Sequence, residues 1–442
     1  MECSTLAAFR QDVVGCFTRA EAALFDLSDA LLSGVEARSL VELADAPLFQ
    51  RRWPSLYAAL GDGQIDRAAL RRVFVQHRPR PEGGQRVVLA VDCSPIVRVA
   101  ARTSADRTLV HVPNMPEGAA PVRPGWVFSA VVMVPDPVSS ATYILDTERV
   151  PSAETATTVG ARHVAAVVAL LTERALLLLD AGYGHALWLL ATEGLAADQL
   201  IRISPTRVLY RPAPPHTGQR GAPRKDGPRF KCSDPATHGA PDAHWTHTET
   251  TGQRVAVSTW GNLHRKECRH LPLTVVRIAH TDAAGKTHAL WFWWVGGALP
   301  PLEELPHLYS RRFAEEHGFK FDKRELLWTA PHVRTPEQMQ RWTDVVAVVH
   351  NELVLALPLA QAERRPWESA ARPLTLRQVR RVSARIMRQV GTPVAPPRPR
   401  GKSPGRAPGT VVKPAPRHPV IRKAPQRATK RTKRPRTRRR AA

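Results

Sequence analysis

Cysteine and tyrosine are both scarce in this chain, with five of each among 442 residues. The cysteines are scattered, odd in number and never arranged as C-x-x-C, which argues against a disulfide framework and favours a reducing compartment. Cysteine and histidine do gather between residues 232 and 270, but their spacing matches no paired Cys/His knuckle. We therefore do not expect structural zinc there.

Long hydrophobic runs are lacking too. The most apolar segment, residues 164–190, is interrupted by charged side chains, and the N-terminus has no basic stretch followed by an apolar one. We therefore expect neither a signal peptide nor a membrane span. A G-x-x-x-x-G-K-[ST] phosphate loop is also missing, which argues against an ATP-driven helicase.

Acidic residues are few beside basic ones: 39 Asp and Glu face 64 Lys and Arg, giving a formal charge of +25. Such an excess favours a polyanionic partner, because each neutralised phosphate releases condensed counterions. Nucleic acid is the first candidate. However, residues 391–442 hold 17 Lys or Arg and no acid, so residues 1–390 carry only about +8. A solvated basic tail could account for much of the excess.

Composition divides the chain into five parts. A helical N-terminal region ends at a Pro- and Gly-rich loop near residue 80, and alternating strands and helices follow it. A β-rich stretch and further helices come next. The last part is a tail too poor in apolar residues to fold alone. We set the boundaries at residues 1–80, 81–204, 205–300, 301–390 and 391–442.

The second part predicts the fold class. Its expected strands are unbroken apolar runs, typical of strands buried on both faces of a sheet covered by helices. They lie at residues 87–91, 127–134, 142–145, 175–179 and 199–203, with helices expected at 155–173 and 183–192. This pattern indicates an α/β core.

Two of these strands end in an aspartate, Asp92 and Asp180. Functional groups of open α/β sheets gather at the carboxyl ends of strands, so both are candidates for catalysis. Either could instead simply begin a turn. Three other carboxylates, Asp136, Asp146 and Glu148, lie on or beside neighbouring strands and are alternatives to Asp92.

The most specific pattern is Y-x2-R-x3-E-x6-K, formed by Tyr309, Arg312, Glu316 and Lys323. On a continuous helix these positions form one polar stripe, although Gly318 could end the helix early and leave Lys323 on a loop. The plainer interpretation is a solvated helix face with an Arg/Glu pair at i, i+4.

This arrangement resembles the signature of bacterial insertion-sequence transposases of the Asp-Asp-Glu (DDE) class. The resemblance covers residues 86–357 and implies an RNase H-like mixed sheet with flanking helices, interrupted by a β-rich insertion at residues 205–300. It implies that Asp92, Asp180 and Glu316 are catalytic and bind two divalent ions, Mg²⁺ or Mn²⁺, which prefer oxygen ligands and support in-line phosphodiester chemistry.

The resemblance also implies partners and DNA contacts. Double-stranded DNA, as transposon ends and target, would be cut and joined by a homodimer in the bacterial cytoplasm, with residues 1–80 a possible end-binding region. Phosphate contacts are expected from Tyr309, Arg312 and Lys323. A tryptophan of the Trp291, Trp293 and Trp294 cluster is expected to stack on a flipped base, although alternating aromatics on a strand are more often core.

Two other functions remain open at this point. The chain could be a transposase-derived DNA-binding protein that no longer cuts, or an RNase H-like repair nuclease that cleaves without joining strands. The intact set of Asp92, Asp180 and Glu316 favours an active transposase.

Overall fold

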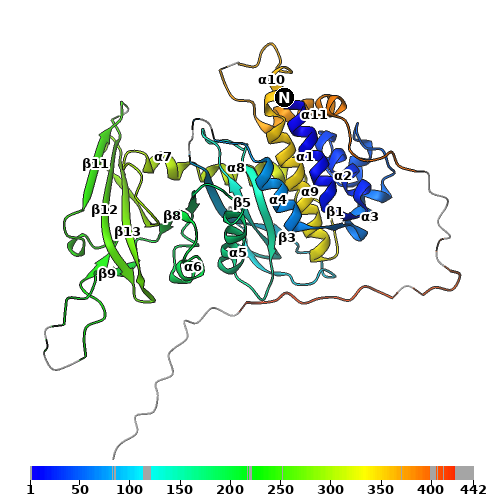
Figure 1. The fold of residues 1–442 in the computed structure, drawn as a ribbon. Helices are drawn as coiled ribbons and strands as arrows, with labels where there is room; N and C mark the ends of the chain where they lie inside the picture. Colours follow the sequence, from blue (N-terminus) through cyan, green and yellow to red (C-terminus); the bar gives the residue numbers. More distant parts are fainter. Residues whose placement is uncertain are drawn as a thin grey trace, which may run out of the picture.

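The computed structural model describes residues 2–81, 83, 86–112, 121–216, 218, 222–250, 252–369, 371–398, 405, 407–411 and 413–423. A central sheet with its helices lies between two other parts. The insertion strands lie on one side of it, and the N-terminal helices, joined by α9 and α11, lie on the other (Figure 1).

The central sheet has the strand order β6-β5-β3-β7-β8. Strand β3 is antiparallel to β5, which is antiparallel to β6, whereas β3, β7 and β8 are mutually parallel. The strands are β3 (Val88–Val97), β5 (Val122–Met133), β6 (Tyr143–Val150), β7 (Ala175–Leu179) and β8 (Ala197–Ile203). This is the order and direction of an RNase H-like sheet, so the predicted fold class is confirmed. A short strand, β4 (Thr108–His111), pairs with the beginning of β5.

Helices cover this sheet in different ways. Helix α5 (Ala156–Val168) packs on β5 and β6, and α6 (Ala186–Ala191) packs on α5. Helix α9 (Pro336–Leu355) runs along β6, where Asn351 accepts from the backbone N–H of Ile144 and donates to its carbonyl, both at 2.8 Å. These bonds occupy backbone groups that a sheet edge otherwise leaves open to pairing with another chain.

The N-terminal region is helical, as expected, but it is not a separate module. Helices α1 (Glu2–Cys16) and α2 (Glu21–Ser33) pack against α9 and α11 (Leu376–Val390). The region is completed by η1 (Val41–Asp45), α3 (Pro54–Asp62), α4 (Arg67–His77) and the paired short strands β1 (Phe17–Arg19) and β2 (Gln64–Ile65). Buried Arg10 ties α1 to Asp29 on α2 at 2.8 Å and to Glu352 on α9 at 3.1 Å.

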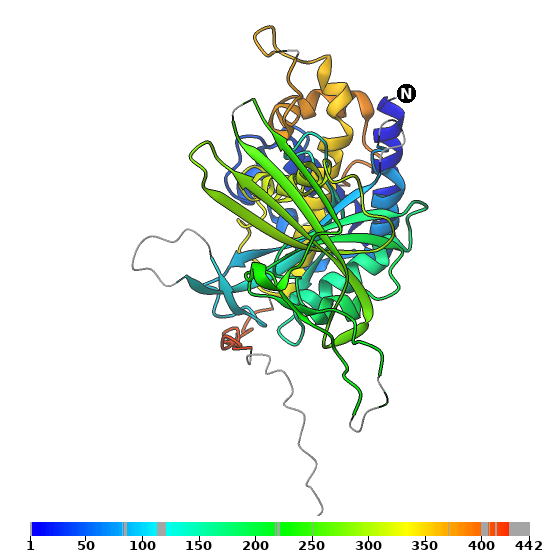
Figure 2. The ribbon, with the colours of Figure 1, turned by 90° about the vertical axis from the view of Figure 1, so that its left-hand side faces the viewer.

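The insertion is β-rich and continues the central sheet, because β14 pairs antiparallel with β8. Its elements are β9 (Val208–Tyr210), β10 (Arg229–Lys231), η3 (Pro235–Thr237), β11 (Ala243–Thr248), β12 (Arg254–Arg265), β13 (Cys268–Thr281) and β14 (Thr287–Val295). Figure 2 looks onto these strands, which lie in front of the core.

The Y-x2-R-x3-E-x6-K pattern lies on two helices, α7 (Leu305–Ser310) and α8 (Phe313–Arg324), and not on one continuous helix. Gly318 does not end α8. It lies inside the helix, and the position requires a glycine because a Cβ there would come within 2.6 Å of the Thr142 hydroxyl oxygen. Lys323 is therefore helical. A short α10 (Leu357–Gln361) follows α9.

Part of the predicted disordered tail is held against the core. Residues 413–423 run past the loop that follows β3, with backbone hydrogen bonds to residues 102 and 107. The rest of the tail beyond residue 423 lies outside the described residues. No helix in the described part of the chain is long and apolar enough to cross a membrane.

Candidate active site

Asp92 and Asp180 lie beside each other because of the sheet register. Val91 of β3 pairs with Leu179 of β7 in a parallel arrangement, and each aspartate is the next residue along its strand. Chain segments almost ninety residues apart thus place two carboxylates at one edge of the sheet. The sequence predicted this edge, and the pairing brings the two side chains together.

Asp92 lies in an environment that opposes its ionisation. Burial raises its pKa to about 6, and the neighbouring charge of Asp180 acts in the same direction. The backbone N–H of Cys93 donates to Asp92 Oδ1 at 2.6 Å and partly offsets this effect. Asp180 is also half-buried, and its Oδ1 accepts from the backbone N–H of Gly182 at 2.8 Å. A nearby cation would relieve the repulsion between the two carboxylates.

Arg312 joins the first aspartate to the glutamate of the motif. Its Nη1 donates to Asp92 Oδ2 at 3.3 Å, and its Nη2 donates to Glu316 Oε1 at 2.7 Å. Burial lowers the pKa of Arg312, but Tyr309, Asp92 and Glu316 outweigh burial and raise it, so the guanidinium is permanently charged. Glu316 is half-exposed and lies at the same site as Asp92. The ordinary i, i+4 pair expected from the sequence exists, but it extends to a third, distant residue.

The other two motif residues surround Arg312 less directly. Tyr309 is buried, and its ring centroid lies 4.5 Å from that of Phe292 on β14. Arg312 Cζ lies 5.9 Å from the centroid of the Tyr309 ring. Lys323 lies about two turns after Glu316, with Nζ 5.9 Å from the Trp328 ring centroid. Burial lowers the pKa of Lys323, and Asp322 and Asp92 act against that shift.

A family model decides the class of protein. The model described as a DDE superfamily endonuclease matches residues 12–265, which is more than half of the chain. The chain belongs to this family. The match includes Asp92 and Asp180 and ends before Glu316. The predicted DDE class is therefore confirmed, whereas the insertion-sequence subgroup stays a prediction.

Other comparisons add little. The cryo-EM structure of a piggyBac transposase synaptic complex with hairpin DNA is similar to the chain with a TM-score of 0.43 and 8% sequence identity, covering 89% of this chain and 80% of that one. No curated protein matches the chain at a significant level.

This DDE endonuclease has a second glutamate that the sequence analysis missed. Glu315 is 1% exposed, and neither of its carboxyl oxygens has a hydrogen-bond partner among the described residues. Burial and the charge of Asp92 raise its pKa well above the ordinary value. The doubled Glu315–Glu316 was visible in the sequence, but only the packing of α8 on β3 shows which one is exposed.

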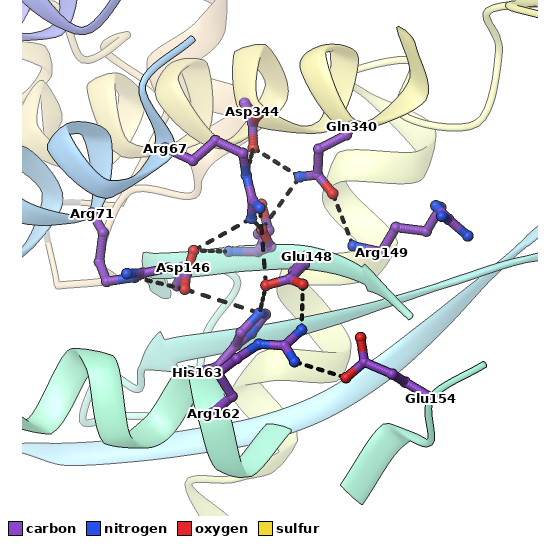
Figure 3. A network of polar contacts seen from close by, with 11 residues as sticks. Arg67, Arg71, Asp146, Glu148, Arg149, Glu154, Arg162, His163, Gln340 and Asp344 are labelled. Atoms are coloured by element: carbon purple, nitrogen blue, oxygen red, sulfur yellow. Dashed lines mark hydrogen bonds and ion pairs between the residues drawn. The ribbon is translucent and has the colours of Figure 1, made fainter. Parts of the chain in front are cut away.

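The alternative carboxylates of the DDE endonuclease belong to other interactions. Figure 3 shows Asp146 and Glu148 of β6 in a network with arginines from α4 and α5. Arg71 Nε lies 2.7 Å from Asp146 Oδ2, and His163 Nε2 lies 2.8 Å from Glu148 Oε2. Asp136 contacts His307 at 2.9 Å. These ion pairs account for all three side chains, which leaves Asp92 as the carboxylate paired with Asp180.

The tryptophan cluster lies inside the structure. Trp291, Trp293 and Trp294 are each at most 5% exposed on β14, next to β8. Trp291 stacks on Trp260 with ring centroids 5.9 Å apart, and Trp294 Nε1 donates to the Gly297 carbonyl at 2.9 Å. A base could stack on any of these rings only after β14 or its neighbours move. The base-stacking role stays a prediction.

The site suits an oxygen-ligated divalent ion at Asp92 and Asp180. These side chains offer hard carboxylate oxygens, and their mutual repulsion is what a cation relieves. Glu316 is held by Arg312. Accordingly, within the described ranges no three His, Cys, Asp or Glu side chains lie close enough together to hold a metal. As a third ligand, Glu316 would be shared with Arg312, which bonds its Oε1.

Proposed function

We propose that this DDE endonuclease is a DNA transposase that cleaves at transposon ends and transfers the freed strands into target DNA by a cut-and-paste route. The observation that supports this most is that Arg312 donates to both Asp92 and Glu316. Asp92 in turn lies beside Asp180, because the preceding residues of β3 and β7 are paired. This arrangement joins the three carboxylates of the proposed DDE triad, drawn from three distant segments, into one site.

The chain's own residues have distinct tasks in this chemistry. Asp92, Asp180 and Glu316 would hold two Mg²⁺ or Mn²⁺ ions, which when bound activate the attacking oxygen and stabilise the leaving oxygen of the phosphodiester. A phosphate entering the site competes with the carboxylates for Arg312, whose planar guanidinium suits bidentate phosphate binding. Transfer of Arg312 to the phosphate frees Glu316, so substrate binding and completion of the ligand set are coupled.

The substrate and assembly follow from this proposal. Double-stranded DNA is the partner, with Tyr309, Arg312 and Lys323 nearest the scissile phosphate. The lowered pKa of Lys323 reflects burial that a phosphate would compensate. We further propose a homodimer in the DNA complex and a bacterial, cytoplasmic protein that joins the nucleoid when bound to DNA.

The test is cleavage of supercoiled plasmid and of plasmid carrying the DNA cloned from both flanks of the gene, with Mg²⁺. We expect Asp92→Asn, Asp180→Asn and Glu316→Gln each to reduce cutting by at least about a hundredfold, the order of losses for key electrostatic groups. Asp136→Asn is the matched control, because Asp136 also follows a core strand but pairs with His307. Equal cutting by wild type and the three variants would refute the assignment.

Joining separates transposition from repair. A precut end incubated with a second plasmid should become covalently joined by wild type. Cleavage without joining would favour the repair nuclease, and DNA binding without cleavage would favour a protein that has lost catalysis.

A further inference from the structure

Part of the C-terminal tail returns to the core and is fixed there by its backbone. The N–H of His418 donates to the Arg102 carbonyl at 2.8 Å, and the N–H of Ile421 donates to the Arg107 carbonyl at 2.7 Å. Arg107 in turn donates from Nη2 to the His418 carbonyl at 2.9 Å. We call residues 413–423 the tail strap. Figure 1 shows it passing beneath the core.

The last described residue of the tail strap fixes its far end. Lys423 Nζ donates to the Pro151 carbonyl at 3.1 Å and to the Glu154 carbonyl at 2.5 Å. Both carbonyls belong to the loop between β6 and α5. Ile421 also forms a parallel bridge with Thr108, so the strap lies along the free edge of β4.

The register shows how close this anchor is to the catalytic carboxylates. Pro95 of β3, three residues after Asp92, is opposite Val127 of β5, which is opposite Val150 of β6. Pro151 is therefore roughly 13 Å along and roughly 10 Å across from Asp92, by the rise and spacing of strands. The tail strap ends at the same edge of the sheet as Asp92 and Asp180.

The charge at this place is positive. Arg102, Arg417 and Arg422 are exposed, and none has an ion-pair partner among the described residues. Two acids close to Lys423 are already paired, Asp106 with Arg149 and Glu154 with Arg162. The sequence after Lys423 contains nine more Lys or Arg and no acid.

We propose that the tail strap is a DNA-phosphate-binding surface. It holds the duplex, beside the scissile bond, across the edge of the sheet that carries Asp92 and Asp180, which we call the carboxylate edge. This inference rests on the proposed function for the identity of the DNA. A duplex carries a phosphate charge about every 1.7 Å of its axis, so one bound at Asp92 presents several phosphates within reach of the strap. The anchor serves to fix basic groups where the cut is made, which an unattached basic tail would not do.

Binding to a random-sequence 40-base-pair duplex over a range of salt concentrations tests the surface. A chain ending at Val411 should bind at least about tenfold more weakly with a shallower salt dependence, because several phosphate contacts are lost. Ile421→Pro removes the N–H that bonds Arg107 but keeps every charge, and it should weaken binding about threefold or more. Ala415→Pro is the matched control, since no hydrogen bond of the Ala415 N–H is recorded in the described strap. Thermal melting should show that all three chains fold.

Crosslinking tests the position. With a duplex carrying one photoreactive phosphate, wild type should crosslink both to residues 417–423 and to α8. Ile421→Pro should lose the strap crosslinks and keep those to α8. If Ile421→Pro and Ala415→Pro bind and crosslink alike, the anchored surface is refuted. If the truncated chain binds more tightly, the strap obstructs DNA and the proposal fails.

The outcome is separable from that of the proposed function. A wild type that binds and crosslinks as described but cuts no DNA would refute the transposase and leave the strap surface standing. A wild type that cuts and joins DNA, with strap variants indistinguishable from it in binding and crosslinking, would refute the strap surface and leave the transposase standing.

Discussion

Arg312 reaches across 220 residues of sequence to donate to Asp92 Oδ2 at 3.3 Å, while the same guanidinium holds Glu316, four residues later on α8. The contact makes one cation the counter-charge of two proposed metal ligands. Arg312 therefore competes with a metal for these carboxylates.

The first prediction follows from that competition. Arg312→Ala should bind Mn²⁺ more tightly than wild type, because the competing charge is gone, yet cut DNA about a hundredfold more slowly, because the phosphate contact is lost. Mn²⁺ titration followed by electron paramagnetic resonance and plasmid cleavage measure the two effects. Arg324→Ala, an exposed cation on the same helix, should change neither. Weaker Mn²⁺ binding by Arg312→Ala would contradict the competition.

A second prediction concerns the attachment of the N-terminal helices. Arg10→Ala leaves Asp29 and Glu352 buried without their partner and should lower the free energy of unfolding by about 3–5 kcal/mol. Urea unfolding followed by circular dichroism measures this. Arg38→Ala removes an exposed pair with Glu36 and should cost less than about 1 kcal/mol. Equal effects of the two changes would show that the buried contact does not hold these helices.

A third prediction concerns pH and Asp344, which is buried in the network of Figure 3. Burial raises the pKa of Asp344 to about 6, and Arg67 and Gln340 only partly oppose it. In the unfolded chain the pKa is about 3.9. Between these values the folded state binds the proton more firmly, so this group's contribution to the free energy of unfolding falls as the pH rises.

The measurement for Asp344 is urea unfolding of wild type and Asp344→Asn at pH 4, 5, 6 and 7. From pH 4 to 7, wild type should lose stability relative to the variant by at most about 3 kcal/mol, the equivalent of the pKa difference. Exposed Asp45→Asn should show no such trend. A difference that grows in favour of wild type with rising pH would mean that Arg67 outweighs burial.

A fourth prediction concerns the tryptophans. Trp293 is fully buried, so Trp293→Ala should lower the free energy of unfolding by about 3–5 kcal/mol. If a tryptophan of this cluster stacks on a flipped base, binding of wild type should change the fluorescence of 2-aminopurine at the cut end, because the base leaves the duplex stack. Unchanged stability of Trp293→Ala would show that the ring is not part of the core.

Sequence patterns anticipated much of this protein because they report local physics. Apolar runs marked the strands, Asp92 and Asp180 stood at strand ends, and the spacing from Tyr309 to Lys323 fixed the register of Glu316. The expected helix at 155–173 ends at Val168, and that at 183–192 begins only at Ala186, because helix ends depend on capping and on contacts outside the segment. The roles of individual site residues stay predictions.

The sequence alone determined the α/β class and the β-rich insertion, which follow from periodicity. The candidate carboxylates followed from strand ends, from the spacing around Glu316 and from the family that this spacing resembles. Only the tertiary structure decided that Arg312 bridges Asp92 and Glu316, that Glu315 rather than Glu316 is buried, that the helix breaks between Ser310 and Phe313, and that the tail strap returns to the carboxylate edge. Each of these depends on which distant segments meet. Short-range patterns carry no record of contacts between residues hundreds of positions apart.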